Sequence, residues 1–99
     1  MTQAEDIKLI LIEMLALLKL SNAKEWEKTI QKLSYEILDI PNETKREILS
    51  LYGGMGSLND LILHKDGYPL KKENDEFDSL KTQLYDLCRE DLIVGKGKE

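Results

Sequence analysis

Residues 7–20 constrain the fold more than any other part of the chain, because nearly all of them are apolar. When the residues are projected at about 100° each, Glu5, Lys8 and Lys19 share one narrow stripe and most of the remaining circumference is apolar. A helix with this pattern is normally surrounded by other helices. We therefore expect a central helix over residues 4–20. The alternative is that one side of this helix stays exposed for a dimer partner.

Composition also favours helices. The 99 residues include 18 Leu and 9 Ile but only one Val and one Phe. Branching at Cγ rather than Cβ suits helices better than strands. With 41% hydrophobic and 33% charged residues, the chain has the composition of a globular protein, and its length suits one domain over residues 1–99.

Four further helices are expected after the first. In the second, Ala23, Trp26, Ile30, Leu33 and Ile37 recur at spacings of three and four, which predicts one buried stripe. The expected N-caps of the second and third helices are Asn22, with Glu25 three residues later, and Asn42. The third, fourth and fifth helices are expected over residues 43–52, 58–63 and about 72–92.

These elements predict an all-α fold, a compact single-domain bundle of about five helices around a central apolar N-terminal helix. A capping box of Ser57 and Asp60 would begin the fourth helix. A short hairpin of residues 61–64 against 68–70 is the alternative there, because Asp66-Gly67 followed by Pro69 indicates a turn. Residues 94–99 are expected to form a frayed tail.

The charge is −5 and is concentrated toward the C-terminus. An acidic protein is repelled by phosphate backbones, so nucleic acid is not an expected partner. Four acidic residues crowd the first turns of the last expected helix, and we call them the acidic cluster: Glu73, Asp75, Glu76 and Asp78. Such a cluster is usually a solvated surface. The functional alternative is that it imitates phosphate and docks into a basic groove of a nuclease.

The sequence indicates a cytoplasmic protein. Its one cysteine, Cys88, cannot form an intramolecular disulfide, which favours a reducing compartment. The apolar segment near the N-terminus follows Glu5 and Asp6, where a signal peptide would carry basic residues. That segment is also too short and too charged to span a bilayer, so no membrane association is expected.

No catalytic, cofactor or metal site is expected. The chain has one histidine and one cysteine, whereas a structural zinc site needs about four nitrogen or sulfur ligands. Cys88 is expected to be a small buried apolar residue rather than a nucleophile. The segment around Gly53, Gly54 and Gly56 lacks the Gly-Lys-Ser/Thr of a phosphate-binding loop. It is better explained as a tight connector in which glycines supply positive φ angles.

This connector also carries a resemblance. Residues 52–60 read Tyr-Gly-Gly-Met-Gly-Ser-Leu-Asn-Asp, and we call them the glycine motif. The chain resembles small all-helical bacterial immunity proteins of toxin–immunity systems, including those of contact-dependent growth inhibition. Those proteins share a leucine-rich first helix and a tryptophan early in the second, where Trp26 stands. The resemblance covers residues 4–65 in outline and 52–61 in specific letters. The motif residues that carry it are Tyr52, Gly53, Gly54, Gly56, Ser57, Asn59 and Asp60.

The resemblance implies an immunity protein without enzymatic activity. It would bind a cognate bacterial toxin domain, a basic nuclease-like one, in a one-to-one complex and cover its active site. The acidic cluster is the expected contact surface, and the glycine motif is expected to be structural scaffold. The alternative function is a helical adaptor or regulator that acts through self-association.

Overall fold

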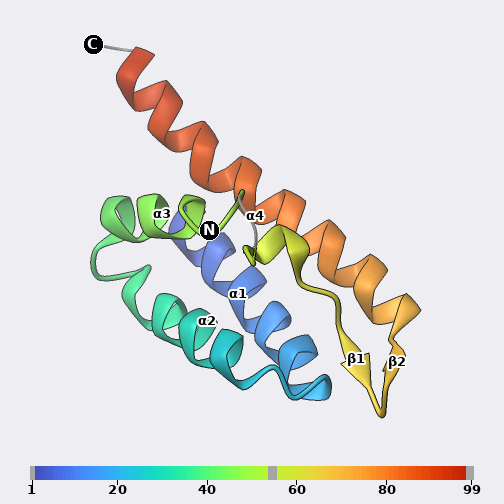
Figure 1. Cartoon of the computed structure of the whole chain (residues 1–99). Helices are drawn as coiled ribbons and strands as arrows, with labels where there is room; N and C mark the ends of the chain where they lie inside the picture. Colours follow the sequence, from blue (N-terminus) through green and yellow to red (C-terminus); the bar gives the residue numbers. More distant parts are fainter. Residues whose placement is uncertain (1, 54–55, 98–99) are drawn as a thin grey trace.

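The computed structural model describes residues 2–53 and 56–97, with side chains described as far as residue 90. Within those residues the protein has four α-helices, one 3-10 turn and one small hairpin, so it has about four helices rather than five (Figure 1). In chain order, the elements are α1 (Gln3–Leu20), α2 (Lys24–Glu36), α3 (Pro41–Leu49), η1 (Leu58–Asp60), β1 (His64–Lys65), β2 (Tyr68–Pro69) and α4 (Lys71–Gly97).

Helix α1 packs against both α2 and α4 and supplies much of the core. It begins with a capping box, in which the Thr2 hydroxyl accepts from the Glu5 N–H and Glu5 accepts from the Thr2 N–H. Its buried face is wholly apolar: Ile7, Ile10, Leu11, Met14, Leu17 and Leu18. The expectation that other helices surround α1 is wrong on one side, where Leu9 and Ile12 are about half exposed.

The expected N-cap of α2 is wrong. Asn22 has φ 59°, the left-handed conformation that asparagine tolerates better than most residues, so it turns the chain after α1 instead of capping α2. The cap position is Ala23, which makes no side-chain cap bond. The predicted buried stripe of α2 is confirmed, with Ile30, Leu33 and Ile37 fully buried. Trp26 is half-buried and packs against this core.

Helix α3 is shorter than expected and begins earlier. Pro41 is its first residue, a position where the missing N–H costs nothing, so Asn42 lies inside the helix rather than at its cap. The helix ends at Leu49, before Tyr52. Lys32 of α2 donates to the Glu47 carboxylate at 2.8 Å, which joins α2 to α3 on the surface.

The segment after the glycine motif forms a hairpin and not the expected helix over residues 58–63. Only η1 is helical there, and β1 then pairs antiparallel with β2. Asp66 and Gly67 both have positive φ, 54° and 83°, as a tight two-residue hairpin turn requires. The Asn74 side chain anchors this hairpin to α4, because it accepts from the Leu63 N–H at 2.7 Å and donates to the Leu63 carbonyl at 3.1 Å.

Helix α4 continues to Gly97, so residues 94–97 are helical rather than a frayed tail, and residues 98–99 lie outside the described residues. As far as residue 90, its buried positions are Phe77, Leu80, Lys81, Leu84 and Cys88. The end of α4 projects beyond the other helices (Figure 1), and the molecule measures 50 × 24 × 21 Å. Among the described residues, no helix is both long enough and apolar enough to cross a membrane.

Candidate functional site

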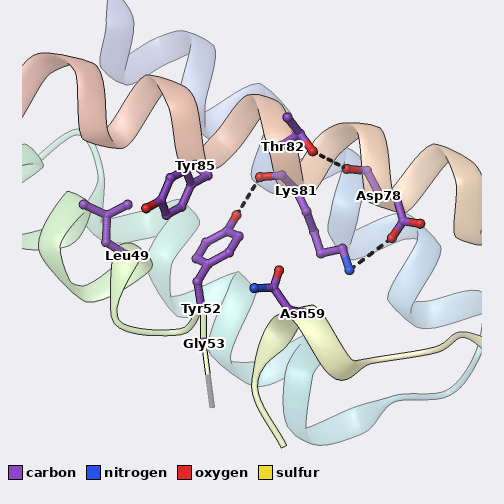
Figure 2. Close-up of a pocket in the computed structure, with 8 residues that line it drawn as sticks. All are labelled: Leu49, Tyr52, Gly53, Asn59, Asp78, Lys81, Thr82 and Tyr85. Atoms are coloured by element: carbon purple, nitrogen blue, oxygen red, sulfur yellow. Dashed lines mark hydrogen bonds and ion pairs between the residues drawn. The ribbon is translucent and has the colours of Figure 1, made fainter. Parts of the chain in front are cut away.

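A cleft of about 540 Å³ lies between the glycine motif and α4 (Figure 2). Three of its lining residues belong to the motif, one ends α3, and four come from consecutive turns of α4. They are Tyr52, Gly53, Asn59, Leu49, Asp78, Lys81, Thr82 and Tyr85. The glycine motif therefore forms one wall of this cleft, and the helix with the acidic cluster forms the other.

Tyr52 holds the two walls of the cleft together. Its hydroxyl donates to the main-chain carbonyl of Lys81 at 2.8 Å, and its ring meets the Tyr85 ring edge-on at 5.0 Å between centroids (Figure 2). Burial raises the pKa of the Tyr52 phenol, with smaller contributions from Cys88, Asp86 and Tyr85. Tyr52 therefore stays neutral and keeps its donor proton at physiological pH.

Lys81 is a buried lysine at the base of the cleft, with only 7% of its surface exposed. Its ammonium pairs with the Asp78 carboxylate at 3.1 Å and reaches the Leu58 carbonyl at 3.5 Å. It also lies 5.4 Å from the centre of the Phe77 ring, within the range of a cation–π contact. A buried charge needs such partners, so Lys81 links α4 to η1 while it fixes the Asp78 side chain.

The glycine motif forms a tight connector as expected. Gly53 and Gly56 have φ of 83° and 75°, which side chains with a Cβ rarely adopt, and Gly54 lies outside the described residues. The Leu58 N–H donates to the Leu51 carbonyl at 2.9 Å and closes the connector on itself. The positive φ angles explain the glycines of this connector, so an anion-binding role is not needed to account for them.

The capping box expected of Ser57 and Asp60 is absent from the described residues. Asp60 instead accepts from the Gly56 N–H at 2.9 Å, which stabilises the connector from within. The Ser57 hydroxyl oxygen is buried and has no hydrogen-bond partner among the described residues. Both residues thus have positions in the scaffold, and neither lines the cleft.

The acidic cluster is divided between two flanks of α4. At about 100° per residue, Asp75 and Asp78 lie about 60° apart and one turn apart on one flank of α4, and Asp78 lines the cleft. Glu73 and Glu76 lie on the opposite flank, where Glu73 is half-buried. Asp78 alone belongs to both the cluster and the cleft lining, and 68% of its side chain is exposed. Among the described residues, no group of three or more His, Cys, Asp or Glu side chains forms a metal-binding arrangement.

Trp26 plays no part in the cleft lining and packs, half-buried, against the core. Sequence reasoning missed Leu49, Lys81, Thr82 and Tyr85 as members of the site. One signal for Lys81 was available: it stands four residues after Phe77 and three before Leu84, on the buried stripe of α4. A lysine at such a position needs a partner, and Asp78 lies three residues before it.

These features define a small, mostly helical protein with an open polar and aromatic cleft beside an acidic stretch of helix. The chain belongs to the DUF6966 family, a domain of unknown function, whose family model matches residues 19–71. That match includes α2, α3, the glycine motif and the hairpin, and it ends before the acidic cluster. No curated protein and no solved structure matches the chain.

Proposed function

We propose that this protein is an immunity protein that binds a cognate bacterial toxin domain and neutralises it without chemistry of its own. The partner is a basic, nuclease-like domain, bound one to one in the cytoplasm, with its active site covered. The observation that carries the proposal is the position of Asp75 and Asp78. Asp78 lines a cleft whose walls include two tyrosines and a side-chain amide, and Asp75 lies exposed one turn before it on α4.

Such a surface suits a protein partner that normally binds phosphate. Carboxylates on a helix can occupy the phosphate positions of a basic nuclease groove, and complementary charge speeds the encounter and selects the partner. Tyr52 and Tyr85 add the aromatic surface that protein interfaces favour. The family match ends at residue 71, before the acidic cluster.

The structure changes how the acidic cluster should be mutated. Reversing Asp78 to lysine would place a second ammonium beside the buried Lys81, so lost binding would be confounded with lost folding. The exposed pair Asp75 and Glu76 forms no ion pair in the described part of the chain, and a double change to lysine there tests charge alone. The matched control is Asp39→Lys with Glu90→Lys, the same charge change at two exposed positions away from the cluster.

The experiment is affinity capture of the tagged full-length protein from its own host at low and high salt, read by mass spectrometry. We expect stoichiometric capture of a basic nuclease domain, weakened by salt, lost with Asp75→Lys/Glu76→Lys and kept with the control. Purified, the captured domain should lose nuclease activity when an equal amount of this protein is added. A captured domain that stays fully active in the complex contradicts the proposal.

A second candidate function is a helical adaptor or regulator that acts through self-association. The observation that favours it is the exposed apolar side of α1, at Leu9, Ile12 and Leu20.

A further inference from the structure

Helix α1 has an apolar strip that neither α2 nor α4 covers. Leu9, Ile12 and Leu20 are 48%, 46% and 49% exposed, and Ala16 between them is also exposed. At about 100° per residue, these four side chains fall within about 80° of the helix circumference. The buried residues of α1 occupy the opposite side. Four apolar residues at spacings of three and four form the pattern that packs against another helix.

The charges beside the strip indicate which helix packs against it. Glu5 and Lys19 lie on the same side of the strip as Ile12, and each is seven residues from Ile12. If two copies of α1 pair antiparallel around a two-fold axis at Ile12, Glu5 of each copy faces Lys19 of the other. A parallel pair would instead bring Glu5 against Glu5 and Lys19 against Lys19. Glu5 and Lys19 are therefore complementary to each other in the antiparallel orientation only, while exposed Glu13 lies near its own copy in either orientation.

We propose that a second copy of this chain occupies the strip, through antiparallel pairing of α1 with α1 about a two-fold axis at Ile12. Ile12 then meets Ile12 at the centre, Leu9 and Ala16 of opposite copies lie beside it, and two Glu5–Lys19 ion pairs close the ends. The proposal does not depend on toxin binding, because the acidic cluster and the cleft belong to α4 and the glycine motif. A dimer formed in this way leaves both of those surfaces for other partners.

The first test is the mass of the full-length protein by sedimentation velocity over a concentration series. We expect the mass of two chains at high concentration. Ile12→Glu places two like charges at the symmetry axis and should raise the dissociation constant by about tenfold or more. Ile62→Glu is the matched control, since Ile62 is a similarly exposed isoleucine just before β1, and it should leave the dimer unchanged. A monomer at every concentration, or equal effects of the two changes, overturns the proposal.

The second test addresses orientation. Lys19→Glu should weaken the dimer, and Glu5→Lys in the same chain should restore part of the loss, because the ion pairs then re-form with reversed signs. Glu5 also caps α1, so Glu5→Lys alone is measured too, and the coupling between the two changes is the quantity of interest. Circular dichroism of each variant confirms that the helices are intact. A dimer without this coupling contradicts the antiparallel arrangement.

Discussion

The hydroxyl of Tyr52 and the main-chain carbonyl oxygen of Lys81 lie 2.8 Å apart, and their hydrogen bond joins two segments 29 residues apart in the sequence. This bond closes the base of the cleft. It also attaches the glycine motif to the same turn of α4 that presents Asp78. The geometry of the cleft therefore depends on one phenol, and not on the glycine backbone alone.

Tyr52→Phe should lower the free energy of unfolding by about 1 kcal/mol, because it removes one partly buried hydrogen bond and little packing. Urea denaturation measures the loss. Tyr68→Phe is the control, since Tyr68 is 75% exposed on the hairpin and should be replaceable without effect. Equal stability of Tyr52→Phe and the natural protein would show that the bond contributes nothing.

Asn74→Ala should cost about 1–3 kcal/mol, because it leaves the N–H and the carbonyl of Leu63 without the amide that pairs with both. Asn74→Asp should cost more, because a carboxylate oxygen would then face the Leu63 carbonyl oxygen. Urea unfolding ranks the two variants. Asn42→Asp, the same change at an exposed position in the first turn of α3, should be neutral or slightly stabilising. Asn74→Asp as stable as the natural protein would contradict this role of the amide.

Gly56→Ala should cost about 1–2 kcal/mol, since Gly56 has φ 75° and residues with a Cβ adopt that conformation at an energetic cost. Apart from its chain neighbours, no atom of the described residues lies within 4 Å of a Cβ built there, so the cost is conformational and not steric. Gly56→Asn should therefore cost less than Gly56→Ala, although asparagine is larger. Thermal unfolding of the two variants gives the order, and the reverse order would indicate a clash.

Stability should fall with rising pH in alkaline solution. Burial raises the pKa of the Cys88 thiol from 9.0 to about 12, although nearby Lys45 acts in the opposite direction. Between these values the unfolded chain has released the thiol proton and the folded chain still holds it. The thiol therefore lowers the free energy of unfolding by about 1.4 kcal/mol per pH unit in this window. The raised pKa of Tyr52 acts in the same direction above pH 10.

Urea titrations from pH 8 to pH 11 test this dependence, with Cys88→Ala as the comparison. The variant loses packing at every pH, but its stability should fall less steeply than that of the natural protein. Parallel curves for the two proteins would mean that the thiol titrates alike in the folded and unfolded chains.

The parts of the fold with a regular apolar repeat could be predicted from the sequence. The stripes of α1, α2 and α4 identified those helices, and most of their predicted core residues are buried. The connections could not be predicted as well, because one residue type serves several purposes there. Asn22 has the sequence context of an N-cap and adopts a left-handed turn, while the true start of α3 is marked by Pro41.

The cleft lay beyond sequence reasoning for another physical reason. Its walls are brought together by contacts between residues far apart in the chain, such as Tyr52 with Lys81. The glycine motif could be recognised as a connector, but nothing local shows which helix it packs against. The acidic cluster could be identified as a group, whereas its division into two flanks follows from the buried side of α4, which Phe77 and Lys81 define.

The two hydrogen bonds between the Asn74 side chain and the Leu63 main chain have a mechanical consequence for the acidic cluster. Asn74 stands between Glu73 and Asp75, so the amide that fixes the hairpin belongs to the turn that carries the charges. The first turn of α4 and the hairpin must therefore move together, because either one can move alone only if these hydrogen bonds break. The hairpin thus restricts movement of the N-terminal turn of α4. A partner would therefore bind acidic side chains whose backbone is already fixed.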